Sequence, residues 1–177
     1  MGELVLVVGG TRSGKSRYAL ERARRSAGDA VTFVATALPG DPELDERIAA
    51  HRRARPAAWA TLDAAADLAR TIAAARGGDL VLVDSLTLWV SARIQASDDE
   101  MADRVDRALA AARARQRGCI FVSDEVGLGI VPPNAMARRF ADRMGTLAQR
   151  VAREADEVVL VVAGRPLPLG GPPRSAA

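Results

Sequence analysis

Eight residues near the N-terminus have the types and spacing of a loop that binds phosphate. They read Gly9-Gly10-Thr11-Arg12-Ser13-Gly14-Lys15-Ser16 and fit the pattern G-x-x-x-x-G-K-[ST]. An apolar run precedes the loop and a helical pattern follows it, which is the strand–loop–helix setting that this motif requires. Small residues let backbone N–H groups turn toward a phosphate, and the helix N-terminus adds partial positive charge. The sequence therefore predicts a site for a nucleoside triphosphate.

Lys15 is the only lysine in the chain, since every other basic side chain is arginine. An ammonium is a compact charge on a flexible stem that can follow the β- and γ-phosphates, whereas a guanidinium is bulkier. We expect Lys15 to take part in catalysis by binding these phosphates, and the Ser16 hydroxyl to bind Mg²⁺. The alternative is an ordinary glycine-rich turn with a surface lysine, and the complete motif, its flanks and the single lysine all argue against it.

A magnesium ion bound with the nucleotide needs a carboxylate from a neighbouring strand end. Asp84 ends the apolar run DLVLVD and suits this position, while Asp124 and Glu125 end another such run and are alternatives. We favour Asp84, so the predicted metal ligands are Ser16 and Asp84.

His51 is the only histidine, and it lies in an arginine-rich segment with Arg47, Arg52, Arg53 and Arg55. A neutral imidazole is a competent nucleophile toward phosphorus, and nearby arginines can hold phosphates in place and discourage protonation of the ring. The alternatives are a half-buried or helix-capping histidine on a solvated basic helix. From the residues alone, nucleophilic chemistry at His51 is a hypothesis.

The remaining motifs exclude two classes of nucleotide-binding protein. A switch GTPase reads guanine with N-K-x-D, which needs a second lysine that the chain lacks. A transporter-type ATPase carries a Ser-Gly-Gly signature before its second acidic strand, and none is present. A small-molecule kinase remains open.

Five valine-rich runs alternate with helical patterns along the chain. The apolar runs do not alternate with polar residues, which is typical of strands buried on both faces of a parallel sheet. Helical spacing separates them, and Asp41-Pro42 and Asp63 read as helix starts. The sequence predicts an α/β fold of three layers around a mostly parallel central sheet, like that of P-loop NTPases. The predicted strands cover 3–8, 30–36, 79–84, 119–124 and 157–162, and the predicted helices cover 15–26, 41–54, 63–75, 99–116 and 134–154.

Length and composition indicate the number of domains and the cellular location of the protein. The chain has 177 residues, so we predict one domain over 1–165 and a loose tail rich in proline and glycine over 166–177. Net charge is only +3 and aromatic residues make up 3%, which argues against a nucleic-acid surface. A single cysteine, Cys119, cannot form an internal disulfide, and no apolar stretch is long enough to span a bilayer. We expect a cytoplasmic protein.

Five segments in order resemble the bifunctional adenosylcobinamide kinase / adenosylcobinamide-phosphate guanylyltransferase family of cobalamin biosynthesis. The glycine loop is common to many families, but H-R-x-x-R-P-x-x-W and E-V-G-x-G-I-V-P together are much more particular. The resemblance covers residues 4–164. The matching segments are GGTRSGKS, VATA (34–37), RIAAHRRARPAAW (47–59), LVDSLTLWV (82–90) and EVGLGIVP (125–132) followed by Arg138, Phe140, Asp142 and Gly145.

The resemblance implies two reactions. The family phosphorylates the aminopropanol hydroxyl of adenosylcobinamide, then transfers GMP from GTP onto that phosphate through GMP bound to a histidine, which here is His51. The products are adenosylcobinamide-GDP and pyrophosphate. A P-loop small-molecule or nucleoside kinase without nucleotidyl transfer is the alternative, and a nucleotide-binding regulatory module without turnover is a third.

The resemblance also implies nucleotide contacts, cofactors and partners. The contacts fall on Gly9–Ser16, on Ala35, Thr36 and Ala37, on Arg52, Arg53, Ala54 and Arg55, on Asp63 and on Asp84. GTP, ATP or both serve as donors with Mg²⁺, and the substrates are adenosylcobinamide and its phosphate. The family implies a homotrimer with active sites between subunits. The composition, in turn, predicts neither a nucleic-acid partner nor a membrane span.

Overall fold

The computed structural model describes residues 2–37, 40, 42–64 and 66–170. In this part of the chain a seven-stranded sheet has the order β3-β2-β4-β5-β1-β6-β7, and every strand pair is parallel except β6 with β7. The expected α/β fold with a mostly parallel sheet is confirmed. The strands are β1 (Leu4–Gly9), β2 (Val31–Ala35), β3 (Ala60–Asp63), β4 (Leu80–Asp84), β5 (Cys119–Asp124), β6 (Glu157–Val162) and β7 (Arg165–Gly170).

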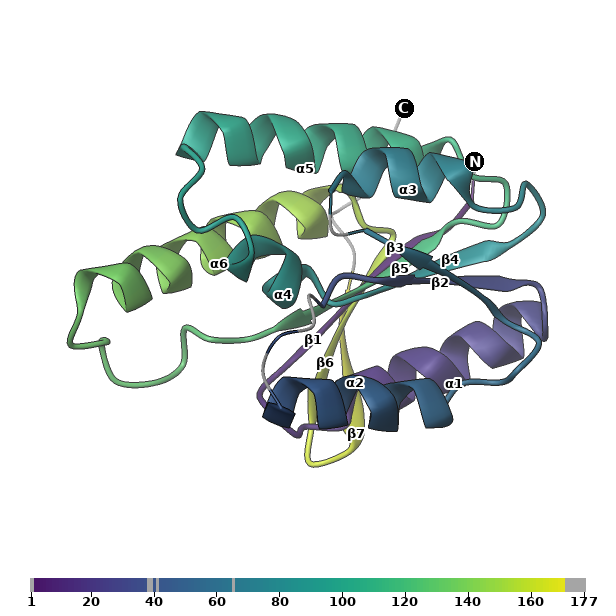
Figure 1. Cartoon of the computed structure of the whole chain (residues 1–177), viewed down its shortest axis with the longest axis horizontal. Coiled ribbons are helices and arrows are strands. Elements are labelled where there is room, and N and C mark those ends of the chain that lie inside the picture. The colour runs from purple at the N-terminus through teal and green to yellow at the C-terminus, as the bar shows by residue number, and fades with distance from the viewer. Residues whose placement is uncertain (1, 38–39, 41, 65, 171–177) are drawn as a thin grey trace.

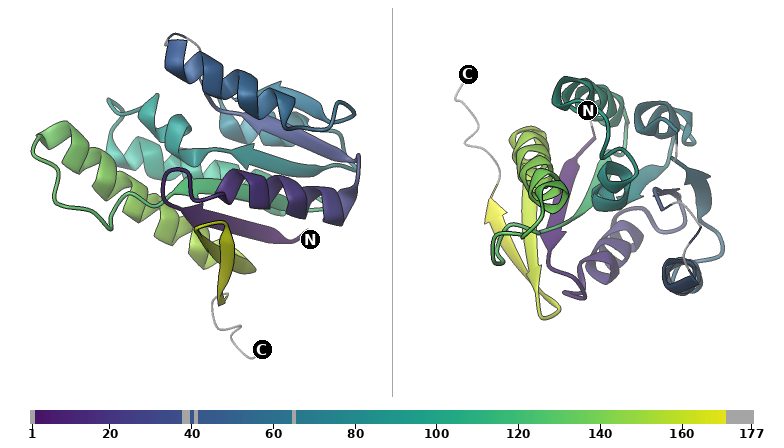
Figure 2. Two further views of the ribbon diagram at one scale, coloured as in Figure 1. Left: turned by 90° about the horizontal axis from the view of Figure 1, so that it is seen from below. Right: turned by 60° about the vertical axis from the view of Figure 1, so that its left-hand side comes forward.

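Helices cover both faces of the sheet (Figures 1 and 2). The first helix, α1, packs on one face, with α2 on the same side of the sheet, while the other helices pack on the opposite face. Among the described residues no helix has the length and apolar character to cross a membrane. The helices are α1 (Lys15–Ala27), α2 (Pro42–Arg53), α3 (Leu68–Ala74), α4 (Leu86–Ser91), α5 (Asp98–Arg113) and α6 (Ala135–Glu154).

A sheet covered by helices on both faces requires strands that are apolar throughout. In β1 the side chains of Leu4 and Leu6 enter the core beneath α3–α6, and those of Val5 and Val7 enter the core beneath α1. All four are at most 1% exposed. Because successive strand residues point to opposite faces, a strand covered on both sides must be apolar throughout.

Two strands were not expected from the sequence. β3 is a four-residue edge strand whose side chains are half-buried or exposed, so it lacks an apolar run. β7 takes up residues 165–170, so the expectation of a loose tail from residue 166 is wrong for 166–170. Its side chains are exposed and it pairs antiparallel with β6, so backbone hydrogen bonds hold it at the sheet edge, where Pro166 and Pro168 are tolerated. Residues 171–177 lie outside the described part, and one domain over 1–165 stays a prediction.

Some helix boundaries also differ from expectation. Asp63 ends β3 instead of starting a helix, and α3 begins five residues later, where the Asp67 side chain accepts a hydrogen bond from the Arg70 N–H at 3.1 Å. The short helix α4 was not predicted; Ser85 caps it immediately after β4. The expected cap at Asp41 lies outside the described residues.

Candidate active site

The glycine loop joins β1 to α1 at the carboxyl edge of the parallel strands, as the motif predicts. Gly14 has φ +94°, in the left-handed region that favours glycine, and it caps α1. Gly9 leaves no room for a side chain, since a Cβ there would lie 2.5 Å from the Val161 carbonyl oxygen. The Ser13 carbonyl accepts a hydrogen bond from the Gly164 N–H at 2.7 Å. The turn between β6 and β7 therefore supports the loop from outside.

Lys15 is the first residue of α1 and is only 9% exposed. Its ammonium donates to the Gly10 carbonyl oxygen at 3.3 Å and forms an ion pair with Asp124 at the end of β5. The lysine thus folds back over its own loop, as a residue that binds phosphates in this loop must. Asp124, one of the alternative metal ligands, is placed directly at the loop.

A cavity of about 560 Å³ opens at this edge of the sheet. This volume lies in the range of small-molecule sites. All four predicted catalytic and metal-binding residues line it, namely Lys15, Ser16, His51 and Asp84. The other predicted residues that line it are Arg12, Gly14, Ala35, Ala37 and Arg55. Residues from the glycine loop, β2, α2 and β4 therefore share one cavity although they lie far apart in sequence.

His51 lies on the last turn of α2 and is directed at the end of β4. Its Nδ1 is 3.7 Å from Oδ2 of Asp84. The histidine side chain is 44% exposed and the aspartate side chain 8%. The predicted nucleophile and the favoured metal ligand are thus direct neighbours, a relation that the sequence did not indicate.

Arg55 is the one arginine of the 52–55 segment that lines the cavity. Its guanidinium lies 3.7 Å from the centre of the Phe33 ring and donates to the His51 carbonyl oxygen at 3.0 Å. Burial lowers the pKa of Arg55, as does the charge of Arg52, while Asp84 acts in the opposite direction. Arg55 is thus held beside the cavity, and its side chain caps a carbonyl group in the last turn of α2.

Other predicted contacts lie outside the cavity. Arg52, Arg53 and Ala54 are exposed and do not line it, and neither does Asp63, which is exposed at the end of β3. Thr36 is buried, and its hydroxyl both donates to the Ser85 carbonyl at 2.7 Å and accepts from the Ser85 N–H at 2.8 Å. Thr36 therefore joins the ends of β2 and β4, whereas Ala35 and Ala37 face the cavity.

Several residues that line the cavity were not predicted from the sequence. Phe33, Ile48, Ser85 and Leu88 contribute to the cavity wall. Ser85 follows a strand end, where ligands of open α/β sheets bind, so its position was a usable signal. The other three are ordinary apolar residues, and only the positions of β2, α2 and α4 in the fold direct them to the cavity.

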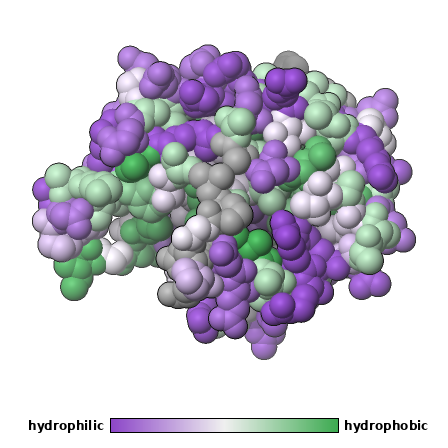
Figure 3. All heavy atoms as spheres, in the orientation of Figure 1, coloured by the Kyte–Doolittle hydropathy of each residue, from purple (hydrophilic) through white to green (hydrophobic). Residues whose placement is uncertain are grey.

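The tryptophans and the loop after β5 differ in exposure. Trp59 and Trp89 are only 6% and 1% exposed, so both pack in the core. In the loop, by contrast, Leu128 and Ile130 are 85% and 98% exposed. Figure 3 shows hydrophobic surface at the lower left, where this loop runs in Figure 1.

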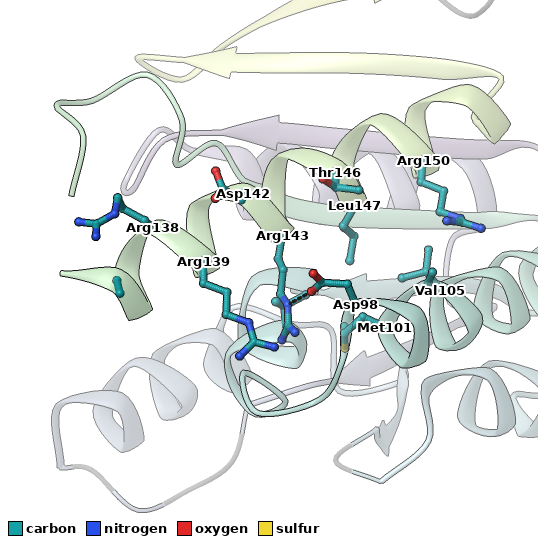
Figure 4. A pocket seen from close by; sticks show the side chains of 13 residues that line it. Asp98, Met101, Val105, Arg138, Arg139, Asp142, Arg143, Thr146, Leu147 and Arg150 are labelled. Carbon is teal, nitrogen blue, oxygen red and sulfur yellow. Dashed lines mark hydrogen bonds and ion pairs between the residues drawn. The ribbon is translucent and has the colours of Figure 1, made fainter. Parts of the chain in front are cut away.

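A second cavity of about 450 Å³ lies between α5 and α6 (Figure 4). Arg138 and Asp142 of the family-like motif line it, but none of the predicted nucleotide-binding residues does. In Figure 4 the Arg143 side chain extends from α6 to Asp98 of α5, and the Nε–Oδ1 distance is 2.8 Å. This cavity is separate from the residues that carry the predicted chemistry.

A strand–glycine loop–helix unit with a buried lysine, in a mostly parallel sheet, defines the class of P-loop nucleotide-binding α/β proteins. Two solved structures have a similar fold. The flagellar accessory protein FlaH from Methanocaldococcus jannaschii has a TM-score of 0.53 and 13% identity, covering 96% of this chain and 79% of its own. The ATPase domain of G40P has a TM-score of 0.50 and 18% identity, covering 89% and 68%. At these identities the likeness shows the fold alone.

Sequence comparison identifies the family. The model of the family described as cobinamide kinase / cobinamide phosphate guanyltransferase matches residues 5–169. The bifunctional adenosylcobalamin biosynthesis protein CobP of Pseudomonas aeruginosa is 44% identical over 95% of this chain and 98% of its own length. The corresponding protein CobU of Salmonella typhimurium is 36% identical over 91% and 96%. The chain belongs to the cobinamide kinase / cobinamide phosphate guanyltransferase family, which confirms the resemblance and disfavours a kinase without nucleotidyl transfer.

Proposed function

We propose that this chain phosphorylates the aminopropanol hydroxyl of adenosylcobinamide and then transfers GMP from GTP to the product through GMP bound covalently to His51. The products are adenosylcobinamide-GDP and pyrophosphate. The observation that carries the proposal is the shared cavity: His51 and the phosphate-binding Lys15 both line it. One triphosphate site then serves both reactions, with a different nucleophile reaching a different phosphorus atom.

In the kinase reaction, backbone N–H groups of the loop and the Lys15 ammonium bind the β- and γ-phosphates. Phosphate oxygens would replace Asp124 as the partner of Lys15, because both bind the same ammonium. The substrate hydroxyl attacks the γ-phosphorus, and the charge that develops toward the leaving diphosphate is stabilised by these donors. The chain supplies mainly position and charge, as in other phosphoryl transfers.

In the guanylyl transfer, the lone pair of the His51 imidazole attacks the α-phosphorus of GTP and pyrophosphate leaves. The bound GMP is then taken by a phosphate oxygen of adenosylcobinamide phosphate, which restores the histidine. A covalent intermediate divides the transfer into two substitutions at the same phosphorus. Arg55, held over Phe33 at the cavity wall, adds positive charge beside the transferred nucleotide.

Magnesium fits this site on the chemistry of its donors. The Ser16 hydroxyl and the carboxylates of Asp84 and Asp124 line the same cavity, and oxygen donors combined with substrate phosphates are what Mg²⁺ takes. We propose Ser16 and Asp84 as the ligands, with Asp124 as the alternative carboxylate. When bound, the ion neutralises charge on the phosphates that leave.

The remaining proposals concern nucleotide contacts and setting. We propose that Gly9–Ser16, Ala35–Ala37, Arg52–Arg55, Asp63 and Asp84 contact the nucleotide, with the lining residues as the innermost set. We also propose a cytoplasmic enzyme, on the strength of the single cysteine, and a homotrimer, on the strength of family resemblance. Light scattering of the purified protein tests the trimer.

Mass analysis after incubation with GTP and Mg²⁺ tests the proposed function. We expect one added GMP on His51, stable to base and lost in mild acid, and absent from His51→Ala. A wild-type protein that gains no GMP and releases no pyrophosphate, while still phosphorylating cobinamide, would leave only the kinase. A protein that binds GTP but turns over neither substrate would be a regulatory module.

A further inference from the structure

The end of β4 presents a carboxylate to the only histidine of the chain. Asp84 Oδ2 is 3.7 Å from Nδ1 of His51, so it is this ring nitrogen that faces the acid. The distance exceeds a hydrogen bond, but such contacts in catalytic sites are often long before substrate binds and tighten in the complex. Both residues line the cavity that we assign to the triphosphate.

Asp84 is buried in the sheet, whereas His51 is partly exposed on a helix. Asp84 is the last residue of a central strand, in register with Ala35 of β2 and Val122 of β5, and its side chain is 8% exposed. The His51 side chain is 44% exposed on the last turn of α2. A buried carboxylate beside a half-exposed ring can therefore select the orientation of that ring.

We infer that Asp84 is a positioning residue for His51, holding the proton on Nδ1 so that the lone pair of Nε2 attacks the α-phosphorus of GTP. This inference rests on the proposed function and adds the tautomer of the nucleophile and the nitrogen that carries GMP. A carboxylate accepts hydrogen bonds and cannot donate one when ionised, so the nitrogen facing it must carry the proton. The other nitrogen, Nε2, is then the nucleophile.

The transfer balances with this assignment. The lone pair of Nε2 forms a bond to the α-phosphorus, and the bond from that phosphorus to the α,β-bridging oxygen breaks with its electron pair, which leaves with pyrophosphate. The proton stays on Nδ1, so the ring becomes an imidazolium that carries GMP on Nε2. The Asp84 carboxylate faces that positive charge and stabilises it.

Because His51 is the only histidine, nitrogen-15 NMR of the labelled whole protein reports a single imidazole. At a pH where the ring is neutral, we expect the tautomer protonated on Nδ1. After reaction with GTP, we expect phosphorus–nitrogen coupling to Nε2. A ring protonated on Nε2, or a phosphorus bond to Nδ1, would overturn the inference.

Asp84→Asn keeps the shape of the side chain but can donate from its amide to Nδ1. We expect a shift toward the tautomer protonated on Nε2 and a fall of about 10–100-fold in the rate of GMP transfer to His51 at saturating GTP. Asp124→Asn is the matched control, since that carboxylate pairs with Lys15 instead of His51. Whatever its effect on GTP affinity, it should leave the tautomer of His51 as in wild type.

Affinity and folding are measured separately, by GTP titration and thermal unfolding of each variant. If Asp84→Asn weakens GTP binding but its tautomer and saturated rate match wild type, Asp84 acts only as a nucleotide or metal ligand and the inference is wrong. If wild type gains no GMP at all, the proposed function fails, and the tautomer still decides whether Asp84 orients the ring.

Discussion

Gly9 and Gly10 are adjacent in the phosphate loop but differ in the space around them. A Cβ on Gly9 would lie 2.5 Å from the Val161 carbonyl oxygen and 2.6 Å from the Ser13 hydroxyl oxygen, whereas one on Gly10 would meet nothing within 4 Å. Neither glycine has positive φ, so alanine is conformationally allowed at both. Gly9→Ala therefore introduces steric overlap, and Gly10→Ala is its control without overlap in the same loop.

The overlap at Gly9 sets the expected magnitude. Ordinary van der Waals contact begins at 3.4 Å, so the Cβ falls about 0.9 Å short of it against a backbone oxygen of β6, which cannot rotate away. Overpacking of this kind costs about 1–3 kcal/mol, or about 2–12 °C in Tm for a chain of this length. A displacement of nearly 1 Å in a loop that positions phosphates should also reduce the kinase rate by about 100-fold.

Thermal unfolding without nucleotide is the first assay, because it measures the overlap independently of any ligand. We expect Gly9→Ala to lower Tm by several degrees and Gly10→Ala to leave it within about 1 °C of wild type. Kinase and GMP-transfer rates of Gly9→Ala at a temperature where it is folded form the second assay. Equal Tm values for the two variants would refute the argument that β6 closes off the loop at Gly9.

Further predictions concern charge and burial. Lys15→Met should abolish measurable GTP binding by calorimetry, because it removes the ammonium and leaves the Asp124 carboxylate unpaired near the phosphates. Burial raises the pKa of the Cys119 thiol, so iodoacetamide should not label the native protein at pH 8 but should label it in urea; rapid native labelling would contradict its buried position. A hydrogen bond from Arg22 lowers the pKa of Glu157 from the usual 4.5. The ion pair therefore stabilises the fold fully above pH 4.5, and this stabilisation is lost as pH falls through the lowered pKa of Glu157. Glu157→Gln should lower the free energy of unfolding by about 1 kcal/mol at neutral pH and by almost nothing well below the lowered pKa. An equal loss at both pH values would refute the pairing.

Local chemistry made the phosphate loop and most strands predictable. The loop from Gly9 to Ser16 is continuous in sequence, so its motif needed no tertiary information. Buried strands need apolar residues on both faces, so their sequences are continuous apolar runs that can be recognised directly. The edge strands β3 and β7 were missed because backbone hydrogen bonds, which need no apolar side-chain pattern, hold them in the sheet.

The sequence by itself determined a phosphate-binding loop with a unique lysine, a parallel α/β core and a single histidine among arginines, because each depends on residues close together in the chain. The tertiary structure decided which of the predicted residues meet. It brought His51 of α2 to Asp84 of β4, directed Thr36 to Ser85 instead of the cavity, and left Arg52, Arg53 and Asp63 outside it. These relations depend on how strands and helices that are distant in sequence pack together, and that packing decides which way each side chain points.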